Sequence, residues 1–263
     1  MPELEIVRGP GLLAYDEGLA LQQRLRADDV AGRSPGALVQ CEHPSVYTAG
    51  RRTEPSDLPT DGSPVVEVDR GGRITWHGPG QLVAYPIVRL ARPLDVVAWV
   101  RDLEQVLIDA AASVGVTAER VDGRSGAWVP RADGSNHDKV GAIGLHVAEG
   151  VTSHGIAINC ANALEAYAAI VPCGIADAGV TTLSRAAGRP VAVDEVAAVV
   201  APRVQAAFDG MLTGSRIASA CSATPPARPA GPDHPTSPHP TAGGEPRLPS
   251  APDRTTDLQE VPA

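Results

Sequence analysis

Residues 140–160, VGAIGLHVAEGVTSHGIAINC, contain two strand-like runs with no helix between them. The runs cover 140–147 and 152–160 and are rich in Val, Ile and Ala, as expected for buried strands. In a fold of strictly alternating strands and helices, a helix would separate them. This stretch therefore favours an α+β fold, in which one central mixed β-sheet is flanked by helices.

The other expected elements lie on either side of this pair. Strands are expected at 36–41, 65–69, 81–88 and 126–129, and helices at 12–31, 95–114 and 194–209. The second helix has the clearest apolar stripe, and Asp95 can cap its amino end. In the third helix Asp194 can act as the cap. Pro202 should bend or interrupt that helix, because proline lacks the N–H that the helix needs.

The composition changes near residue 214. From Pro225 to the end, the chain holds 11 of its 25 prolines and has no Phe, Tyr or Trp. Such a segment cannot bury enough apolar surface to offset the entropy cost of ordering. We therefore expect a folded domain over 1–213 and a Pro-rich disordered tail over 214–263, in which His234 and His239 are solvated.

Charge and hydropathy exclude several classes of protein. The formal net charge is −9, so a nucleic-acid partner is not expected. No apolar run reaches the ~18 residues of a membrane span. The first residues, MPELEIVRGPG, do not resemble a secretory signal peptide. These features predict a cytoplasmic protein that does not bind membranes.

Residues 70–81, RGGRITWHGPGQ, form the first candidate site. Their four glycines let the backbone approach a ligand closely, because glycine has no Cβ. The alternative is a long hairpin turn, which would need fewer glycines. We expect a binding loop, although it matches neither the Walker nor the dinucleotide-binding phosphate motif.

Lys139 is the second candidate, because it is the only lysine among the 22 basic residues. Arginine fills every other basic position, so a need for charge alone does not explain a lysine here. A desolvated lysine can lose its proton and act as a base, whereas arginine stays protonated. The alternative is an ordinary solvated lysine at the start of a strand.

Cys173 is the third candidate, since it lies between Pro and Gly, where a defined turn is expected. Its thiolate would need a nearby cation or helix amino terminus. The pattern also allows a Cys–His pair between Cys173 and His43, His77 or His154.

The remaining cysteines and histidines give no sign of a site. Cys41 and Cys160 fit buried small side chains, and Cys221 in the tail fits no role. His137 and His146 are expected at the surface or in the core. The cysteines form no CxxC pair and the histidines no HxH or HExxH pair, so no metal site is expected.

These segments together closely resemble the lipoyl(octanoyl) transferases, the octanoyl-acyl-carrier-protein:protein N-octanoyltransferases of the lipoate-protein ligase B family. The matching segments follow the family's order from residue 12 to about 210. They are 43–51, 70–87, 126–129, 139–147, 151–159, 170–175 and 179–183. Trp76 stands where the family often has Tyr. The resemblance implies a fold like the catalytic domains of biotin and lipoate protein ligases.

The resemblance also implies a Cys/Lys dyad, in which Cys173 is the nucleophile and Lys139 its acid–base partner. His43 and His154 then become secondary candidates. Backbone N–H groups near Cys173 and Gly174 would stabilise the oxyanion. The octanoyl chain would lie in an apolar slot lined by Arg70, Gly71, Gly72, Arg73, Ile74, Thr75, Trp76, His77, Ala142, Ile143, Gly144, Gly155, Ile156 and Ala157.

The implied reaction transfers an octanoyl or lipoyl group from acyl carrier protein to a specific lysine of a lipoyl domain. The acceptors would be the E2 subunits of 2-oxoacid dehydrogenases and the glycine cleavage H protein. The reaction would pass through a Cys thioester and would need neither ATP nor a metal. Because both protein partners are generally acidic, a local patch of Arg51, Arg52, Arg70 and Arg73 is expected to dock them.

Three alternatives remain open from the sequence. The first is an ATP-dependent lipoate or biotin protein ligase on the same fold. The second is a Cys-dependent acyl thioesterase, in which water replaces the amine. The third is a binding module for lipoyl domains or carrier proteins that has no catalytic activity.

Overall fold

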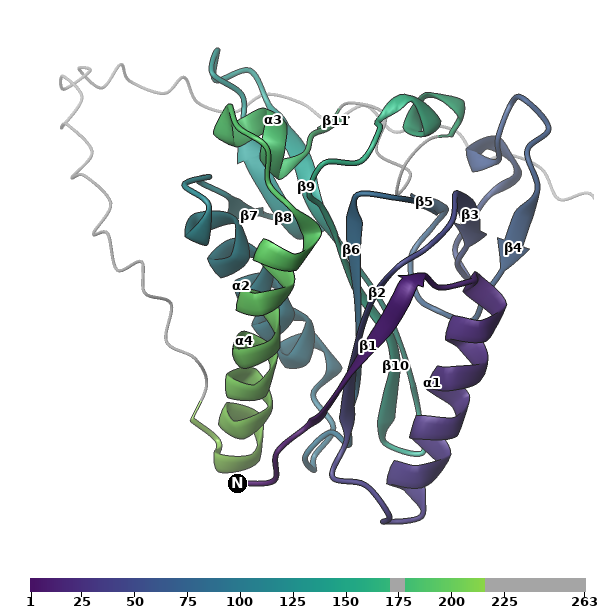
Figure 1. The fold of residues 1–263 in the computed structure, drawn as a ribbon, viewed down its shortest axis with the longest axis vertical. Coiled ribbons are helices and arrows are strands. Elements are labelled where there is room, and N and C mark those ends of the chain that lie inside the picture. Colours follow the sequence, from purple (N-terminus) through teal and green to yellow (C-terminus); the bar gives the residue numbers. More distant parts are fainter. Residues whose placement is uncertain (171–177, 216–263) are drawn as a thin grey trace, which may run out of the picture. The chain divides into compact units, whose positions relative to one another are not determined.

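The computed structural model describes residues 1–170 and 178–215, whose central feature is an eight-stranded mixed sheet (Figure 1). β1 pairs with β2 and β11 with β9 in parallel, and the other neighbouring strands pair antiparallel. The spatial order is β1 (Glu5–Leu12), β2 (Ala37–Glu42), β6 (Gln81–Ile87), β10 (Val151–Asn159), β9 (His137–Ala148), β8 (Arg124–Pro130) and β7 (Glu119–Val121), with β11 (Gly179–Val180) on β9.

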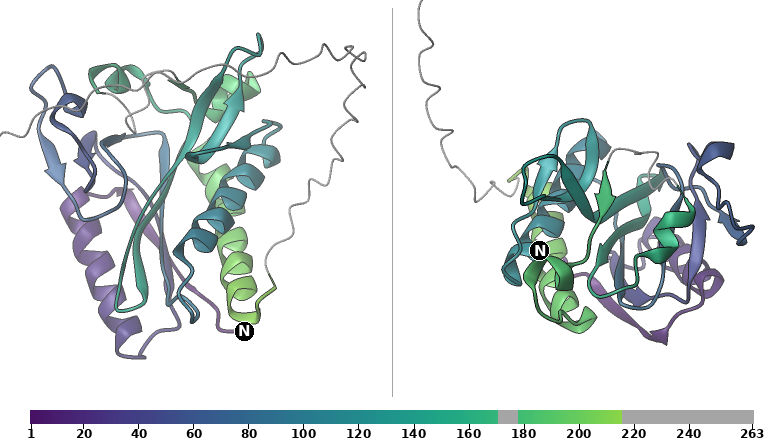
Figure 2. Two further views of the ribbon diagram at one scale, coloured as in Figure 1. Left: turned by 180° about the vertical axis from the view of Figure 1, so that it is seen from behind. Right: turned by 90° about the horizontal axis from the view of Figure 1, so that it is seen from above.

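Helices cover both faces of this sheet (Figures 1 and 2). α1 (Tyr15–Val30) lies against β6 and β10, whereas α2 (Val96–Ser113) and α4 (Val193–Thr213) lie side by side on the opposite face. The core beneath α2 and α4 contains Trp99 and Phe208, both almost fully buried. Burial of side chains of this size stabilises the fold by about 1.5–3 kcal/mol each. The expected mixed sheet with flanking helices is confirmed.

A second, three-stranded sheet holds the glycine-rich segment. Its order is β4 (Val65–Glu67), β3 (Val46–Ala49) and β5 (Thr75–His77). The segment 70–81, expected to be one loop, therefore contains a short strand, and residues 70–73 form the loop before it. Ile74 and Trp76 pack with Tyr47 and Ile170 in a separate apolar cluster. The short elements that complete the described chain are η1 (Pro55–Asp57), η2 (Glu165–Ala169) and α3 (Leu183–Ala187).

The clearest helix of the sequence is found as predicted. α2 begins at Val96, and the Asp95 carboxylate accepts the backbone N–H of Ala98 at 2.8 Å. This cap supplies an acceptor to one of the amino-terminal N–H groups that have no partner within the helix. Trp99, Leu103 and Leu107 of the predicted stripe are buried against the sheet.

Three expectations about the first and last helices are wrong in whole or in part. The first helix does not begin at residue 12, because residues Glu5–Leu12 form β1 and pair with β2. The sequence Gly9-Pro10-Gly11 hides this strand, but an edge strand tolerates proline and a register shift. Of the two effects expected of Pro202, an interruption does not occur, because α4 runs continuously from Val193 to Thr213 with Pro202 inside it and packs against α2. Ala192 rather than Asp194 precedes the first turn.

α4 ends at Thr213, and Gly214 takes the left-handed conformation with φ +71° that commonly closes a helix. Of the predicted tail 214–263, all but Gly214 and Ser215 lies outside the described residues, so the domain boundary stays a prediction. None of the helices in the described ranges has the length and apolar character needed to cross a membrane.

Candidate active site

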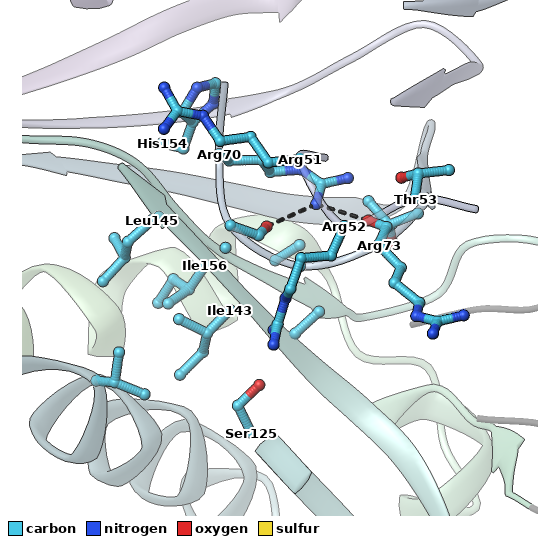
Figure 3. Close-up of a pocket in the computed structure, with 18 of the residues that line it drawn as sticks. Arg51, Arg52, Thr53, Arg70, Arg73, Ser125, Ile143, Leu145, His154 and Ile156 are labelled. Carbon is cyan, nitrogen blue, oxygen red and sulfur yellow. Dashed lines mark hydrogen bonds between the residues drawn. The ribbon is translucent and has the colours of Figure 1, made fainter. Parts of the chain in front are cut away.

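A cavity of about 1230 Å³ lies along β9 and β10 (Figure 3). It is also bounded by the loop 70–73 and by residues of α1, β6 and the amino-terminal end of α2. The structure brings most of the predicted site residues together in its wall, namely Arg70, Gly71, Gly72, Arg73, Thr75, His77, Lys139, Ala142, Ile143, Gly144, His154, Gly155, Ile156 and Ala157. Ile74, Trp76 and His43 do not line it.

The residues that line the cavity fall into two groups, called here the helix branch and the tyrosine branch, because β9 and β10 expose different side chains on their two faces. In this antiparallel pair Ile143 lies opposite Ile156, and Ala142 lies opposite Ala157. Side chains alternate between the faces of a sheet. The helix branch is formed by Val96, Val100, Ile143, Leu145 and Ile156, and the tyrosine branch by Tyr15, His77, Val83, Tyr85, Ala142 and Ala157.

The structure shows why glycine is needed at positions 144 and 155, which the sequence did not reveal. A Cβ on Gly144 would lie 2.9 Å from Cδ of Arg70. A Cβ on Gly155 would lie 2.6 Å from Cδ of Pro86 and would also collide with the backbone of Ala84 on β6. These glycines therefore admit neighbouring protein atoms, whereas Ala142 and Ala157 leave open space in the tyrosine branch.

Arg70 is a structural residue of the loop. Its buried guanidinium donates hydrogen bonds to the carbonyl oxygens of Gly71, Arg73 and Thr48 at 2.7–3.0 Å, and to the Thr48 hydroxyl at 2.9 Å. Figure 3 shows the bonds to Gly71 and Arg73 as dashed lines. This network fixes the loop against β3.

Two of the four arginines predicted to dock the partners, Arg70 and Arg73, already make contacts within the protein. Arg70 is buried, and Arg73 is paired with Asp57 at 3.1 Å and Glu54 at 2.5 Å. Arg51 and Arg52 are exposed at the cavity rim and have no acidic partner within ion-pair distance among the described residues. Only these two of the four arginines can therefore offer a free positive charge to a partner.

Lys139 lies in the cavity wall near the start of β9 and is 8% exposed. Its Nζ is 4.8 Å from the centroid of the buried Trp128 ring on β8, a cation–π contact. Gly126, with φ +107°, brings the backbone of β8 close to the lysine, because a Cβ there would lie 3.1 Å from Cε of Lys139. The ammonium is thus held at the cavity rather than free in solvent.

Cys173, Gly174 and Cys221 lie outside the described residues. The flanks of the segment that carries Cys173 are described, however. On one side Ile170 packs against Trp76, and on the other Val180 of β11 pairs with Lys139. The backbone N–H of Thr181 also donates to the carbonyl of Lys139 at 2.9 Å. Val180 and Thr181, which follow the segment in sequence, are therefore held against the strand that carries Lys139.

The tyrosine branch ends on a hydrogen-bonded, uncharged floor. The Tyr85 hydroxyl is 2.7 Å from Nε2 of His43, whose Nδ1 is 2.6 Å from the carbonyl oxygen of Leu13. Tyr15 stacks on His77 with 6.1 Å between ring centroids. Burial raises the pKa of Tyr15 to about 12 and lowers the pKa of His77 to about 3. Both side chains are therefore neutral near pH 7.

A family model described as the lipoyl protein ligase A/B catalytic domain matches residues 14–205 of this chain. The chain belongs to this family. Curated relatives are identical to this chain at more than half of the aligned positions. The octanoyltransferase of Clavibacter sepedonicus is 61% identical over 193 residues, which cover 72% of this chain and 83% of the relative. The octanoyltransferase of Nocardia farcinica is 55% identical over 207 residues, 79% of this chain and 83% of the relative.

Solved structures confirm the fold of the domain. The bipartite lipoate protein ligase of Thermoplasma acidophilum superposes with a TM-score of 0.58 at 13% identity, over 80% of this chain and 85% of the other. A lipoate-protein ligase A bound with ATP gives the same TM-score at 13% identity, over 79% and 86% of the two chains. At this identity the likeness concerns the fold alone.

The two secondary candidates, His43 and His154, both make hydrogen bonds away from Lys139. His43 is fully buried behind Tyr85. His154, with φ +57°, places Nε2 2.7 Å from Asp69, and burial lowers its pKa although the Asp69 carboxylate opposes that shift. His154 pairs with Leu145, six residues along β9 from Lys139, or about 20 Å of extended strand. It is therefore too far away to act on the same atom as Lys139.

The remaining cysteines and histidines of the described residues are either buried or in contact with an acidic side chain. Burial raises the pKa of Cys41 and Cys160 to about 12, so both thiols stay protonated. His137 contacts Glu119 at 2.7 Å and His146 contacts Asp69 at 3.4 Å. Within the described ranges, no three His, Cys, Asp or Glu side chains converge as a metal ion would require. Tyr15 and Tyr85 of the cavity were not predicted, because each stands singly in an apolar run.

Proposed function

We propose that this chain is an octanoyltransferase of protein lipoylation, the activity for which its relatives are named. It moves an octanoyl group from acyl carrier protein to a lysine of a lipoyl domain through a thioester on Cys173. The observation that supports this best is the position of Lys139, the only lysine of the chain. It lies in the wall of a cavity with an apolar branch, on the strand that pairs with the carboxyl-terminal flank of the Cys173 segment.

In the first step, the Cys173 thiolate attacks the carbonyl carbon of the octanoyl thioester. A new C–S bond forms, and the bond to the carrier's phosphopantetheine sulfur breaks. The departing thiolate takes a proton from the Lys139 ammonium, which leaves the lysine neutral. The products of this half-reaction are octanoyl-Cys173 and the free carrier thiol.

In the second step, the amine of the acceptor lysine attacks octanoyl-Cys173. A C–N bond forms, the C–S bond to Cys173 breaks, and neutral Lys139 takes the proton that the amine loses. The Cys173 thiolate and the Lys139 ammonium are thereby restored. An amide replaces a thioester, so the exchange is downhill and consumes no ATP.

The tyrosine branch is the proposed site of the octanoyl chain. Its apolar wall is formed by Val83, Ala142 and Ala157, and its floor by Tyr15 and Tyr85. Each CH₂ group that leaves water for such a wall contributes about 0.8 kcal/mol. The acceptors would be lipoyl domains of 2-oxoacid dehydrogenase E2 subunits and the glycine cleavage H protein.

Intact mass measurement tests the proposal against its rivals. Incubation with octanoyl carrier protein, without ATP, should add one octanoyl group to the wild type but none to Cys173→Ser. A lipoyl domain added next should discharge the adduct and gain the octanoyl group. A requirement for ATP and free octanoate would instead indicate a ligase. Release of octanoate at one rate with and without the lipoyl domain would indicate a thioesterase.

A further inference from the structure

The proposed acyl site uses the tyrosine branch alone and leaves the helix branch without an assigned ligand. Val96 and Val100 approach it from α2, and Ile143 and Leu145 from β9, so its wall is apolar. Figure 3 shows Ile143, Leu145 and Ile156 on the side of the strands that faces the helix, away from Arg70 and His154. A thioester that reacts beside Lys139 extends in two directions, the acyl chain one way and the thiol's own chain the other. The cavity offers a branch for each.

The edge of β9 is open where the branches meet. β8 pairs with β9 only as far as Gly141, and the next described contact at this edge is the Gly71 N–H, which donates to the Leu145 carbonyl at 2.8 Å. In an antiparallel strand, residues two apart direct their N–H and C=O groups to the same side. Because the Leu145 carbonyl points outward, the backbone groups of Ile143 do so as well. They can bind the amides of an extended chain.

The rim of the cavity carries two arginines whose backbone positions are fixed by the loop 70–73. The backbone N–H groups of Arg51 and Arg52 donate at 3.0 Å to the carbonyls of Arg70 and Gly72. Their side chains have no acidic partner among the described residues, in a protein whose net charge is −9. In Figure 3 the Arg52 side chain extends from the loop in the direction of Ser125. Arginine pairs suit the recognition of phosphate.

We propose that the helix branch and the Arg51–Arg52 pair bind the phosphopantetheine arm of the acyl donor. The arm combines a phosphate, an apolar dimethyl carbon and two amides in one extended chain. The phosphate binds the two arginines, the dimethyl carbon packs on Val96 and Val100, and the amides lie along the free edge of β9 at Ile143. This inference rests on the proposed transferase function and specifies where the donor's thiol side lies.

Three truncated donors without carrier protein test the arginine pair. They are octanoyl-phosphopantetheine, octanoyl-pantetheine, which lacks the phosphate, and octanoyl-N-acetylcysteamine, which lacks most of the arm. The wild type should prefer the first over the second. The double variant Arg51→Gln, Arg52→Gln should lower kcat/KM about tenfold for the phosphorylated donor, equivalent to about 1.4 kcal/mol, and leave the other two donors unchanged. Arg24→Gln, an exposed arginine of α1, is the matched control and should change none.

The variant Val100→Phe tests the apolar part of the branch. The larger side chain should lower kcat/KM for both pantetheine donors and leave octanoyl-N-acetylcysteamine unaffected. That third donor also reports whether the variant is folded and active.

Two results would overturn the arm site. One is a wild type that uses phosphorylated and unphosphorylated donors equally well. The other is a set of variants in which KM rises for the lipoyl domain instead of the donor, since the branch would then hold the acceptor. A wild type that transfers octanoyl from none of these donors, nor from octanoyl carrier protein, would count against the proposed function itself.

Discussion

The Lys139 ammonium nitrogen lies 4.8 Å from the centroid of the Trp128 ring, and the two residues are paired across β8 and β9. The ring face attracts the positive charge and holds the side chain against the cavity wall. Trp128→Leu should therefore lower the transfer rate about three- to tenfold, in line with the ~0.5–2 kcal/mol of a cation–π contact. Trp128→Phe keeps a ring face and should lose less. Steady-state rates and thermal midpoints, measured together, separate this effect from loss of folding.

Lys139→Arg tests the acid–base role directly. The variant keeps the positive charge but loses a group that can give up its proton, so transfer should fall by ~10²–10⁴-fold. Arg189→Lys, at a surface residue paired with Glu195, adds a lysine elsewhere and should leave the rate unchanged. A Lys139→Arg variant that keeps more than about a tenth of the wild-type rate contradicts the role, since general acid–base catalysis accounts for more than this.

Gly144→Ala should disturb the cavity through Arg70. The new Cβ would lie 2.9 Å from Arg70 Cδ, so the arginine must move and weaken its bonds to Thr48. We expect a loss of about 1–3 kcal/mol in the free energy of unfolding and a lower transfer rate. In the background of Arg70→Ala the same glycine substitution should cost less. Purely additive losses in this double-mutant cycle would show that the two residues are not coupled.

The buried His77 predicts a pH dependence of stability. Its folded-state pKa is lowered to about 3 by burial, below the ordinary value of 6.5. The unfolded chain then binds more protons, so the stability from neutral His77 is complete above pH 6.5 and is lost as the pH falls toward 3. Each such proton contributes a slope of about 1.4 kcal/mol per pH unit. Urea unfolding between pH 7 and 4 should show a smaller slope for His77→Gln, and equal slopes would refute this assignment.

Truncation after Ser215 tests the predicted domain boundary. α4 is complete at Thr213 and closed by Gly214, so the shortened chain should keep its thermal midpoint and its transfer rate. A clear loss of either would mean that residues beyond 215 contribute to the folded domain or to its reaction.

The elements that the sequence predicted best are those with a signal in their own residues. α2 was evident from its apolar stripe and from Asp95, and β10 was expected from its position next to β9 with no helical segment between the two. β1 was missed because Gly9 and Gly11 break its pattern, and its pairing partner β2 lies more than 25 residues away. Such a strand is stabilised by pairing with a distant segment, and a local sequence pattern does not reveal that pairing.

The site residues also fall into those with a signal in the local sequence and those without one. Lys139 stood out in the composition, and the glycine-rich loop in its own sequence. The floor of the tyrosine branch did not, because Tyr15, His43 and Tyr85 come from three separate elements and meet only in the folded chain. The need for glycine at position 144 could not be predicted either, because it depends on where the Arg70 side chain lies.

The stacking of Lys139 on Trp128 also provides a spectroscopic probe. Because the chain contains a single lysine, isotope-labelled lysine introduces one ε-amine signal that needs no assignment. The indole ring current shields nuclei above its face, so the terminal methylene protons of Lys139 should resonate well upfield of those of a solvated lysine. That shift reports the distance between the amine and the ring at each stage of acyl transfer.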